Sequence, residues 1–412
     1  MFKKIRRRLG SVLKTKCWSN KAGAHQESVH DQMPGTSEAR RESEDRPEQV
    51  NTQGHVNKKE HKESPLFPMK PRDVVRHFGH KLSDFELKEF SEYSELWYLG
   101  KAESNGNNIQ VSPDHIAYRY EVLEKLGKGS FGQVFKCLDH KTNEMVAVKI
   151  IQDMRTYRKE VEILKYLRKK DRNDSYNIVF MKTHFYFRGC LCIVFELLGP
   201  TLRELKRSLR FSKADVRHIA KDVVKCLTLL EKEKIIHGDL KPRNIMQREK
   251  GQGIKLIDFG GSSFEQMNQF LGAYTPFYCP PEVIMNHQST TAIDMWSLGC
   301  ILAELHTGQY LFHGVDGYDQ IALIMEVLGM PPIEFVQKES TWDFFYDHKG
   351  RYRTVIDSKG RKINPGSKDL QGILHTNDLQ FLDFIQRCLT WNPEQRLTPT
   401  EAMKHPWLQN ID

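Results

Sequence analysis

The stretch His237-Gly-Asp-Leu-Lys-Pro-Arg-Asn244 decides the fold, together with Asp258-Phe-Gly260, which begins fourteen residues after it. In order, the two segments supply a carboxylate, a lysine, and the carboxamide and carboxylate side chains that hard divalent cations prefer. This order and spacing is typical of sites that transfer a phosphoryl group from ATP. The second motif alone carries little weight, because so short a pattern occurs by chance. The set as a whole, met in order with further elements, predicts such a site.

Each polar side chain of the two segments has an expected role. Asp239 orients the acceptor hydroxyl and accepts its proton, and Lys241 neutralises the transferring phosphate. Asn244 and Asp258 hold Mg²⁺ (or Mn²⁺), with ATP as the co-substrate that supplies further ligands. A strand over residues 254–257 is expected to deliver Asp258 to the site.

A glycine-rich segment upstream is expected to cover the nucleotide. Gly127, Gly129 and Gly132 form the pattern GxGxxG, and glycines let a backbone approach phosphates closely. Dinucleotide-binding turns show the same glycines, but there the loop enters a helix, whereas residues 133–138 here continue as a strand. The predicted nucleotide contacts are Leu126, Gly127, Lys128, Gly129, Ser130, Phe131, Gly132, Gln133 and Val134.

The strand expected over residues 146–151 places Ala147 and Lys149 on one face, because strand side chains alternate. The small Ala147 leaves room for adenine, and Lys149 can reach the α- and β-phosphates. In the helix that follows, Glu160 shares the face of the apolar residues 163, 164 and 167, and Glu162 lies opposite. We therefore predict that Glu160 is the ion-pair partner of Lys149.

Two further regions complete the expected site and its support. At the end of a strand, Phe195 would wall the adenine pocket, and the linker backbone would bind the purine through Glu196, Leu197 and Leu198. Ordinary core packing of Phe195 is equally compatible with the sequence. Downstream, Glu282 and Arg396 are expected to form a buried ion pair, and Asp294 is expected to tie the backbone of the catalytic loop.

Three segments resemble the dual-specificity tyrosine-regulated kinases (DYRK), in particular class II. They are the homology box Asp114-His-Ile-Ala-Tyr-Arg-Tyr-Glu-Val122, the aromatic-rich block 68–99, and the series 293–304 with Val327-Leu-Gly-Met-Pro331. The resemblance implies an α+β, bilobal protein kinase fold with a β-rich N-lobe (120–198) and a helical C-lobe (199–408). It places an accessory region with the homology box at 67–119. It also implies phosphorylation of Ser and Thr in protein substrates, and tyrosine autophosphorylation during maturation.

The activation loop departs from this family. Its Tyr-x-Tyr falls on Phe270-Leu-Gly272, its flanking arginines fall on Pro276 and Cys279, and its glutamate before the metal-binding asparagine is Arg243. The segment 275–282 instead resembles the TPxYxxPE pattern, in which a threonine, here Thr275, bridges the catalytic Asp and Lys. A phosphotyrosine normally orders such a loop through arginines. We expect constitutive order or activation through another residue such as Tyr274, and a preference shifted away from proline-directed sites.

The sequence leaves two alternatives to an active protein kinase to be weighed. A pseudokinase or scaffold would typically lose Lys149, Asp239 or Asp258, and all three are present. A small-molecule phosphotransferase should lack Pro281-Glu282 and the charged insert 335–372. Both features are found here.

Composition bounds the remaining possibilities. No apolar run is long enough to span a membrane, and the eight cysteines are scattered without a CxxC pair, as in reduced intracellular proteins. Most of the net charge of +9 comes from residues 1–16, which hold seven Lys or Arg and no acid; the remainder is almost neutral, so no nucleic-acid partner is expected. Residues 1–66 are expected to be a basic start followed by disorder. The start is a solvated tail, a membrane-surface helix or a nuclear import signal, in a monomer of the cytoplasm or nucleus.

Overall fold

The computed structural model describes residues 67–100, 114–129, 132–152, 154–249, 251, 253–267, 275–336 and 345–409. Of these, the residues up to Glu95 belong to one compact unit and those from Leu96 onward to another. Phe270–Gly272, Tyr274 and the basic start of the chain, on which several expectations rest, lie outside the described residues.

The smaller unit consists of short helices, α2 (Pro71–Phe78), η1 (Gly79–Lys81), α3 (Asp84–Glu89) and η2 (Phe90–Glu92). Proline suits the first turn of α2, where its missing N–H is not needed. Ser83 and Glu86 hydrogen-bond reciprocally at the start of α3, as in a capping box. Val74 is buried, and the rings of Phe67 and Phe78 stack at 6.3 Å. The aromatic block is therefore a helical element.

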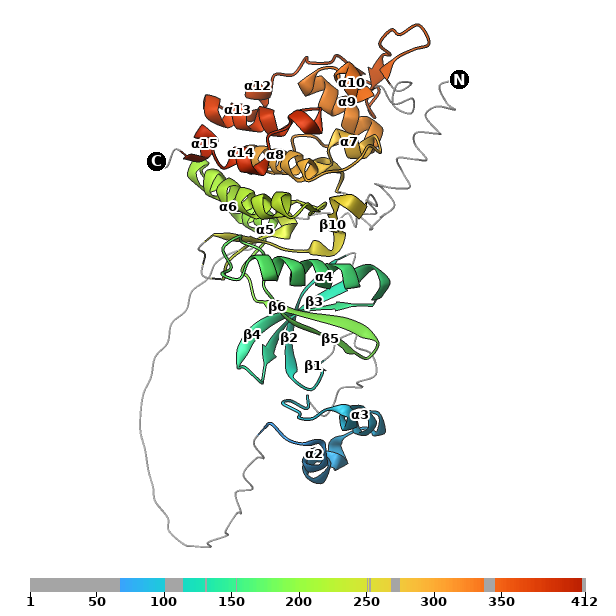
Figure 1. Ribbon diagram of the computed structural model, residues 1–412, viewed down its shortest axis with the longest axis vertical. Coiled ribbons are helices and arrows are strands. Elements are labelled where there is room, and N and C mark those ends of the chain that lie inside the picture. The colour runs from blue at the N-terminus through green and yellow to red at the C-terminus, as the bar shows by residue number, and fades with distance from the viewer. Residues whose placement is uncertain are drawn as a thin grey trace, which may run out of the picture. The chain divides into compact units, whose positions relative to one another are not determined.

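A curled antiparallel sheet forms the first lobe of the larger unit, and its strand order is β1-β2-β3-β4-β6-β5 (Figure 1). The sheet already begins in the homology box, because β1 pairs with β2. The strands are β1 (His115–Ile116), β2 (Tyr120–Gly129), β3 (Gly132–Asp139), β4 (Glu144–Ile151), β5 (Met181–Phe187) and β6 (Cys190–Glu196). The central strands β4 and β6 are nearly continuous apolar runs, as expected of strands covered on both faces.

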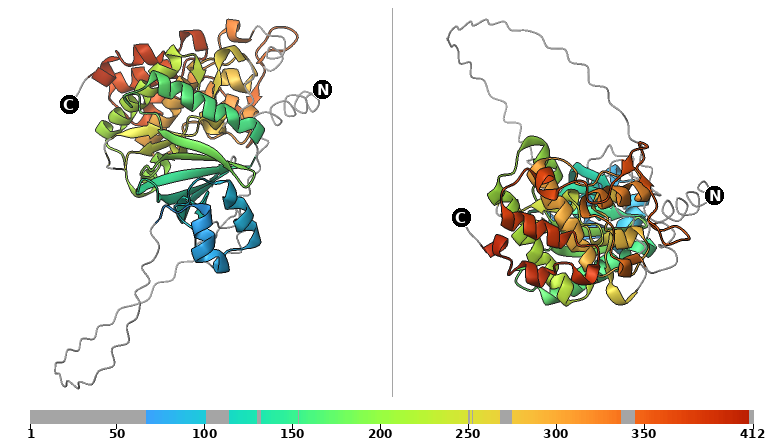
Figure 2. Two further views of the ribbon diagram at one scale, coloured as in Figure 1. Left: turned by 60° about the horizontal axis from the view of Figure 1, so that its bottom comes forward. Right: turned by 90° about the horizontal axis from the view of Figure 1, so that it is seen from above.

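Helix α4 (Met154–Lys170) packs against β5 and β6 and lies between the sheet and the helical lobe, as Figures 1 and 2 show. Its apolar side chains Ile163, Leu164 and Leu167 are buried. Glu160 is buried on the same face and Glu162 is exposed, as the helical spacing predicts. The helix thus carries one carboxylate into the interior between the lobes.

The helical lobe is built around α8 (Ala292–Thr307), which is buried along almost its whole length. Such a helix is apolar on all sides because other helices cover it; α6 and α13 pack directly on it. The other helices are α5 (Leu202–Ser208), α6 (Lys213–Lys232), α7 (Pro281–Ile284), α9 (Gly317–Leu328), α10 (Ile333–Val336), α12 (Leu370–Leu374), α13 (Leu379–Cys388), α14 (Pro399–Ala402) and α15 (Pro406–Gln409).

Short two-stranded pairs and 3₁₀ turns connect these helices and carry the polar motifs. The strand pairs are β7 (Ile235–Ile236) with β10 (Ser263–Phe264), β8 (Ile245–Gln247) with β9 (Ile254–Leu256), and β11 (Val355–Ile356) with β12 (Lys362–Ile363). The turns are η3 (Pro242–Asn244), η4 (Phe259–Gly261), η5 (Glu265–Met267), η6 (Pro276–Tyr278) and η7 (Pro393–Gln395). In the part of the chain that the structure describes, no helix is long and apolar enough to cross a bilayer.

Candidate active site

The catalytic loop between β7 and η3 is fixed by a carboxylate from the core helix. Asp294 of α8 accepts hydrogen bonds from the backbone N–H groups of His237 (2.8 Å) and Gly238 (3.0 Å). Gly238 has φ +80°, a conformation that glycine adopts without strain. The expected tie between Asp294 and this loop is therefore present, and it sets the direction in which the next side chain, Asp239, points.

Asp239 lies at the centre of a compact hydrogen-bonded group. Lys241 Nζ is 2.5 Å from Asp239 Oδ2. The Thr275 hydroxyl donates to Asp239 Oδ1 and accepts from Lys241, both at 3.1 Å. Burial raises the pKa of Asp239, and the charge of Lys241 opposes that rise. The bridge by Thr275 joins the activation segment to the catalytic loop.

Asn244 and Asp258 together fit a hard divalent cation. The Asn244 amide nitrogen donates to the carbonyl of Asp239 (2.8 Å), so its amide oxygen faces the other way. Asp258 sits at the end of β9 with φ +64°, a left-handed conformation that Asp tolerates better than most residues. Burial tends to raise the pKa of Asp258, but the charge and hydrogen bond of Lys149, together with the charges of His237 and Lys241, hold the pKa below its ordinary value. One ionised carboxylate and one amide oxygen are ligands that Mg²⁺ or Mn²⁺ accepts.

Lys149 connects the first lobe to this site. Its Nζ lies 2.9 Å from both carboxylate oxygens of Glu160 and 2.9 Å from Asp258 Oδ1. Burial lowers the pKa of Lys149, but the two carboxylates prevail and raise it above its usual range. The ammonium group therefore stays charged where an anionic phosphate would approach, and the predicted Lys149–Glu160 pair is found.

The glycine-rich segment forms the hairpin of β2 and β3. Gly127 pairs with Val134, and Gly129 pairs with Gly132. Leu126 and Lys128 lie on β2 and Gln133 lies on β3, whereas the hairpin tip, Ser130 and Phe131, lies outside the described residues. The expected strand–turn–strand is thus present in place of a strand–turn–helix.

The expected adenine end of the cleft lies where β4 pairs with β6. Ala147 is opposite Phe195, which is buried against the core. Glu196 ends β6, Leu197 and Leu198 follow it, and the Gly199 N–H then donates to the Gln247 carbonyl at 2.9 Å. The linker is thereby held to the helical lobe.

An ion cluster around the buried Lys255, behind this linker, was not predicted. Lys255 of β9 is fully buried, with its Nζ 2.7 Å from Asp174 and 2.6 Å from Glu196 Oε1. The same Glu196 oxygen accepts the Phe180 N–H at 2.7 Å. The cluster therefore joins β9, the linker and the segment before β5. The only signal in the sequence was a lone lysine within an apolar strand.

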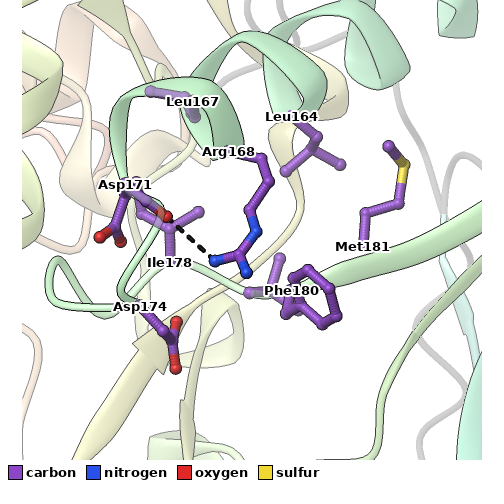
Figure 3. A pocket seen from close by; sticks show the side chains of 9 residues that line it. Leu164, Leu167, Arg168, Asp171, Asp174, Ile178, Phe180 and Met181 are labelled. Atoms are coloured by element: carbon purple, nitrogen blue, oxygen red, sulfur yellow. Dashed lines mark hydrogen bonds between the residues drawn. The ribbon is translucent and has the colours of Figure 1, made fainter.

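Asp174 also lines a hollow between the end of α4 and the segment that leads into β5 (Figure 3). Arg168 crosses this hollow, donates to the Asp171 carbonyl (3.0 Å) and stacks on the Phe180 ring at 4.5 Å. None of the predicted catalytic side chains lines it. The hollow is therefore separate from the site around Asp239.

The predicted scaffold ion pair is present within the helical lobe. Arg396 Nη1 lies 2.5 Å from Glu282 Oε1, and Nη2 lies 2.9 Å from Oε2. The guanidinium group also donates to the carbonyls of Thr390 and Ala292, and it lies over the Trp296 ring. All its donors thus point at fixed acceptors, which suits a structural role.

The sequence of the chain matches known proteins. Residues 120–408 match the protein kinase domain family. The chain is 47% identical over 361 residues to the human dual specificity tyrosine-phosphorylation-regulated kinase 4, a match that covers 82% of this chain and 69% of that protein. It is 45% identical over 370 residues to kinase 2 of the same name from Drosophila melanogaster, covering 83% of this chain and 51% of the fly protein. The chain thus spans about half the length of the fly relative.

These matches confirm the bilobal α+β kinase fold and the resemblance to this kinase family, and the human kinase 4 is among the relatives matched. The pseudokinase alternative finds no support, since Lys149, Asp239 and Asp258 are all present and meet in one site. Membership implies ATP, a divalent metal and protein substrates. The chain is a protein kinase and belongs to the family of dual-specificity tyrosine-phosphorylation-regulated kinases.

Proposed function

We propose that the chain transfers the γ-phosphate of ATP to serine and threonine hydroxyls of proteins, with Asp239 as the base. The observation that carries this assignment is the hydrogen-bonded group of Asp239, Lys241 and Thr275. One carboxylate there is held by two neighbours, one of them cationic, at the end of a fixed loop. Such a carboxylate can orient an incoming hydroxyl and accept its proton.

The surrounding side chains supply positive charge and position. Lys241 faces the position of the transferring group, and Lys149 lies where the α- and β-phosphates would bind. Asn244 and Asp258 would hold Mg²⁺ or Mn²⁺, and the metal would neutralise charge on the phosphates. Glu160 keeps Lys149 in place by contacts at 2.9 Å from both carboxylate oxygens.

The nucleotide base would bind between β4 and the linker. The small Ala147 side chain leaves space there, and Phe195 closes the rear of the cleft. The backbone of 196–198 would hydrogen-bond the purine edge, while the β2–β3 hairpin would cover the phosphates. Lys255 holds Glu196 from behind, so the linker has little freedom to move.

We further propose that the activation segment is ordered without a phosphotyrosine. Thr275 already bridges Asp239 and Lys241 in the unmodified chain. The residue before Asp239 is Gly238, which has no side chain that could bind a phosphate. The Tyr278 hydroxyl is 2.5 Å from Glu304 Oε2 and is buried with it, which disfavours its modification.

A turnover assay tests the catalytic assignment. The purified full-length chain should convert ATP to ADP in the presence of Mg²⁺ and a serine- or threonine-containing protein substrate. Asp239→Asn should lose about 10²–10⁴-fold in kcat, the usual contribution of a general base. Equal and negligible rates for both proteins would refute the assignment.

Mass spectrometry of the same preparations tests the activation segment. We expect full activity without stoichiometric phosphotyrosine in residues 270–278. Activity that rises in proportion to phosphotyrosine in that segment, for example at Tyr274, would contradict constitutive order.

The other parts of the proposal concern the setting of the enzyme. Within the described residues the cysteines are buried and form no disulfide, which supports a reducing compartment such as the cytoplasm or nucleus. We propose a monomer whose basic first residues, 1–16, contact a membrane surface or an import receptor. Deletion of residues 1–16 without any change of distribution in cells would exclude both contacts.

A further inference from the structure

Three arginines gather beside the catalytic loop. Arg203 and Arg207 lie four residues apart on α5 and therefore on one face of that helix. Arg243 lies on η3, and α5 packs directly against η3. We refer to Arg203, Arg207 and Arg243 as the basic cluster. Two of its members, Arg207 and Arg243, are exposed, and Arg203 is half-buried.

Nearby acidic groups offset only part of the charge of this cluster. Glu204 is engaged in the capping box of α5, where its carboxylate accepts from the backbone and hydroxyl of Thr201 at 2.8 and 2.9 Å. Glu304 is bound by Lys206 (2.6 Å) and Tyr278. Within the described ranges, no ion pair joins a carboxylate to any arginine of the cluster.

The positive charges of Arg203, Arg207 and Arg243 repel one another. Partial burial lowers the pKa of Arg243, and the neighbouring charges of Arg203 and Arg207 lower it further. An anion bound among them would relieve that repulsion, and guanidinium groups bind carboxylates and phosphates in a forked, bidentate geometry.

The cluster borders the place where an acceptor hydroxyl must approach. Arg243 is the residue between Pro242 and Asn244, within the loop that presents Asp239 and Lys241. Side-chain contacts also lead from the activation segment to α5: the Phe277 ring lies 4.6 Å from that of Tyr310, and Lys206 of α5 lies over Tyr310 at 5.2 Å. A peptide held with its hydroxyl at Asp239 would therefore pass the cluster.

We propose that the basic cluster selects protein substrates that carry an anionic side chain close to the phosphorylated Ser or Thr. This inference rests on the proposed function and adds its substrate class. Opposite charge would speed association and hold the acidic peptide, whereas a basic peptide would be repelled. The anion is a carboxylate of Asp or Glu, or the phosphate of a residue phosphorylated beforehand, and both offer the same acceptor chemistry.

The experiment compares matched peptides with the purified full-length enzyme. Each peptide has one serine acceptor flanked on both sides by Glu, by Gln or by Arg, and a fourth has phosphoserine in place of one Glu. We expect kcat/KM for the Glu peptide to exceed that for the Gln peptide by roughly tenfold, as a few solvent-exposed charge pairs would give. The Arg peptide should be poorer still, and the preference should fade at high salt. Better use of the phosphoserine peptide than of the Glu peptide would identify phosphate as the preferred anion.

Variants of the basic cluster test whether its arginines cause the preference for the Glu peptide. Arg243→Gln, and Arg203→Gln combined with Arg207→Gln, should each reduce the ratio of Glu to Gln peptide toward one. Arg387→Gln is the matched control, because Arg387 is an exposed arginine on α13, away from α5, and pairs with Asp383. That control should keep the wild-type ratio while removing the same net charge as Arg243→Gln.

Two readouts separate failure of this inference from failure of the proposed function. Equal kcat/KM for the Glu and Gln peptides, with Asp239→Asn inactive, would overturn the inference and leave the kinase assignment intact. Absence of turnover with every peptide would refute the catalytic assignment. Fluorescence anisotropy with the same peptides would then still decide the inference, which fails if the Glu and Gln peptides bind equally.

Discussion

Two ion clusters in the kinase unit have similar chemistry but different access to water. Arg396 and Glu282 have side chains that are 0% and 1% exposed, and they lie inside the helical lobe. Lys149 and Asp258 are 10% and 25% exposed and border the nucleotide cleft. Both clusters join a cation to carboxylates at 2.5–2.9 Å.

The difference in exposure assigns them different tasks. A closed pair whose donors are all occupied can only hold the fold, and losing one partner strands the other charge in the interior. The Lys149 cluster is open on one side, so its charge can act on a bound anion, and water can partly solvate whatever a mutation leaves unpaired. Stability should therefore depend on the first cluster and turnover on the second.

The largest expected effect comes from breaking the closed pair. Arg396→Met should lower the free energy of unfolding by about 3–5 kcal/mol, because Glu282 would remain charged and buried without its partner. Denaturant titration followed by circular dichroism measures it. Combining Arg396→Met with Glu282→Leu should recover much of the loss. A single variant as stable as wild type would show that the pair does not hold the fold.

A mutation in the Lys149 cluster should instead reduce turnover more than stability. Lys149→Met should reduce kcat/KM by about 10²–10³-fold, the usual loss when one group that stabilises transition-state charge is removed. Its free energy of unfolding should change less than that of Arg396→Met, which the same titration tests. If Lys149→Met unfolded the protein as readily, the proposed division between the two clusters would be wrong.

Glu160 and Glu162 sharpen the comparison within one helix. Glu160→Gln keeps the shape of the side chain but removes the charge that orients Lys149, and it should reduce kcat/KM by about 10- to 100-fold, the worth of a charge-assisted hydrogen bond. Glu162→Gln removes the same charge from the exposed face of α4. Steady-state kinetics should show no more than a twofold change for this control.

The contrast also explains which parts of the site could be predicted from sequence. Helical spacing separated Glu160 from Glu162, because one face of α4 is apolar and the other is polar. The grouping of Asp239 with Asn244 followed from short motifs whose members are close along the chain. Lys255 and the basic cluster were missed as sites because their partners are distant in sequence: Lys255 pairs with Asp174 and Glu196 only after β9 has docked beside the linker. No local pattern encodes such a contact.

A third ion pair, in the homology box, lies between the two extremes and gives the smallest expected effect. Arg119 binds Asp139 at the end of β3 through two hydrogen bonds of 2.7 and 2.6 Å, with side chains 29% and 3% exposed. Burial tends to raise the pKa of Asp139, but the hydrogen bonds from Arg119 and from the Lys141 backbone prevail and lower it.

Because the folded pKa of Asp139 is lowered, the pair stabilises the fold above the unfolded pKa of about 3.9, and this contribution is lost as pH falls through the folded pKa. Acid titration of wild type should therefore show a loss of folding stability below about pH 4 that Asp139→Asn lacks. At pH 7 this variant should be less stable than wild type by only about 1 kcal/mol, because Arg119 remains partly hydrated. Arg119→Met should remove the same pH dependence. If both variants lost stability in acid as wild type does, the low exposure of Asp139 would not be enough to make its ion pair stabilising. The number of fixed hydrogen-bond donors around a carboxylate would then decide how much an ion pair stabilises this kinase.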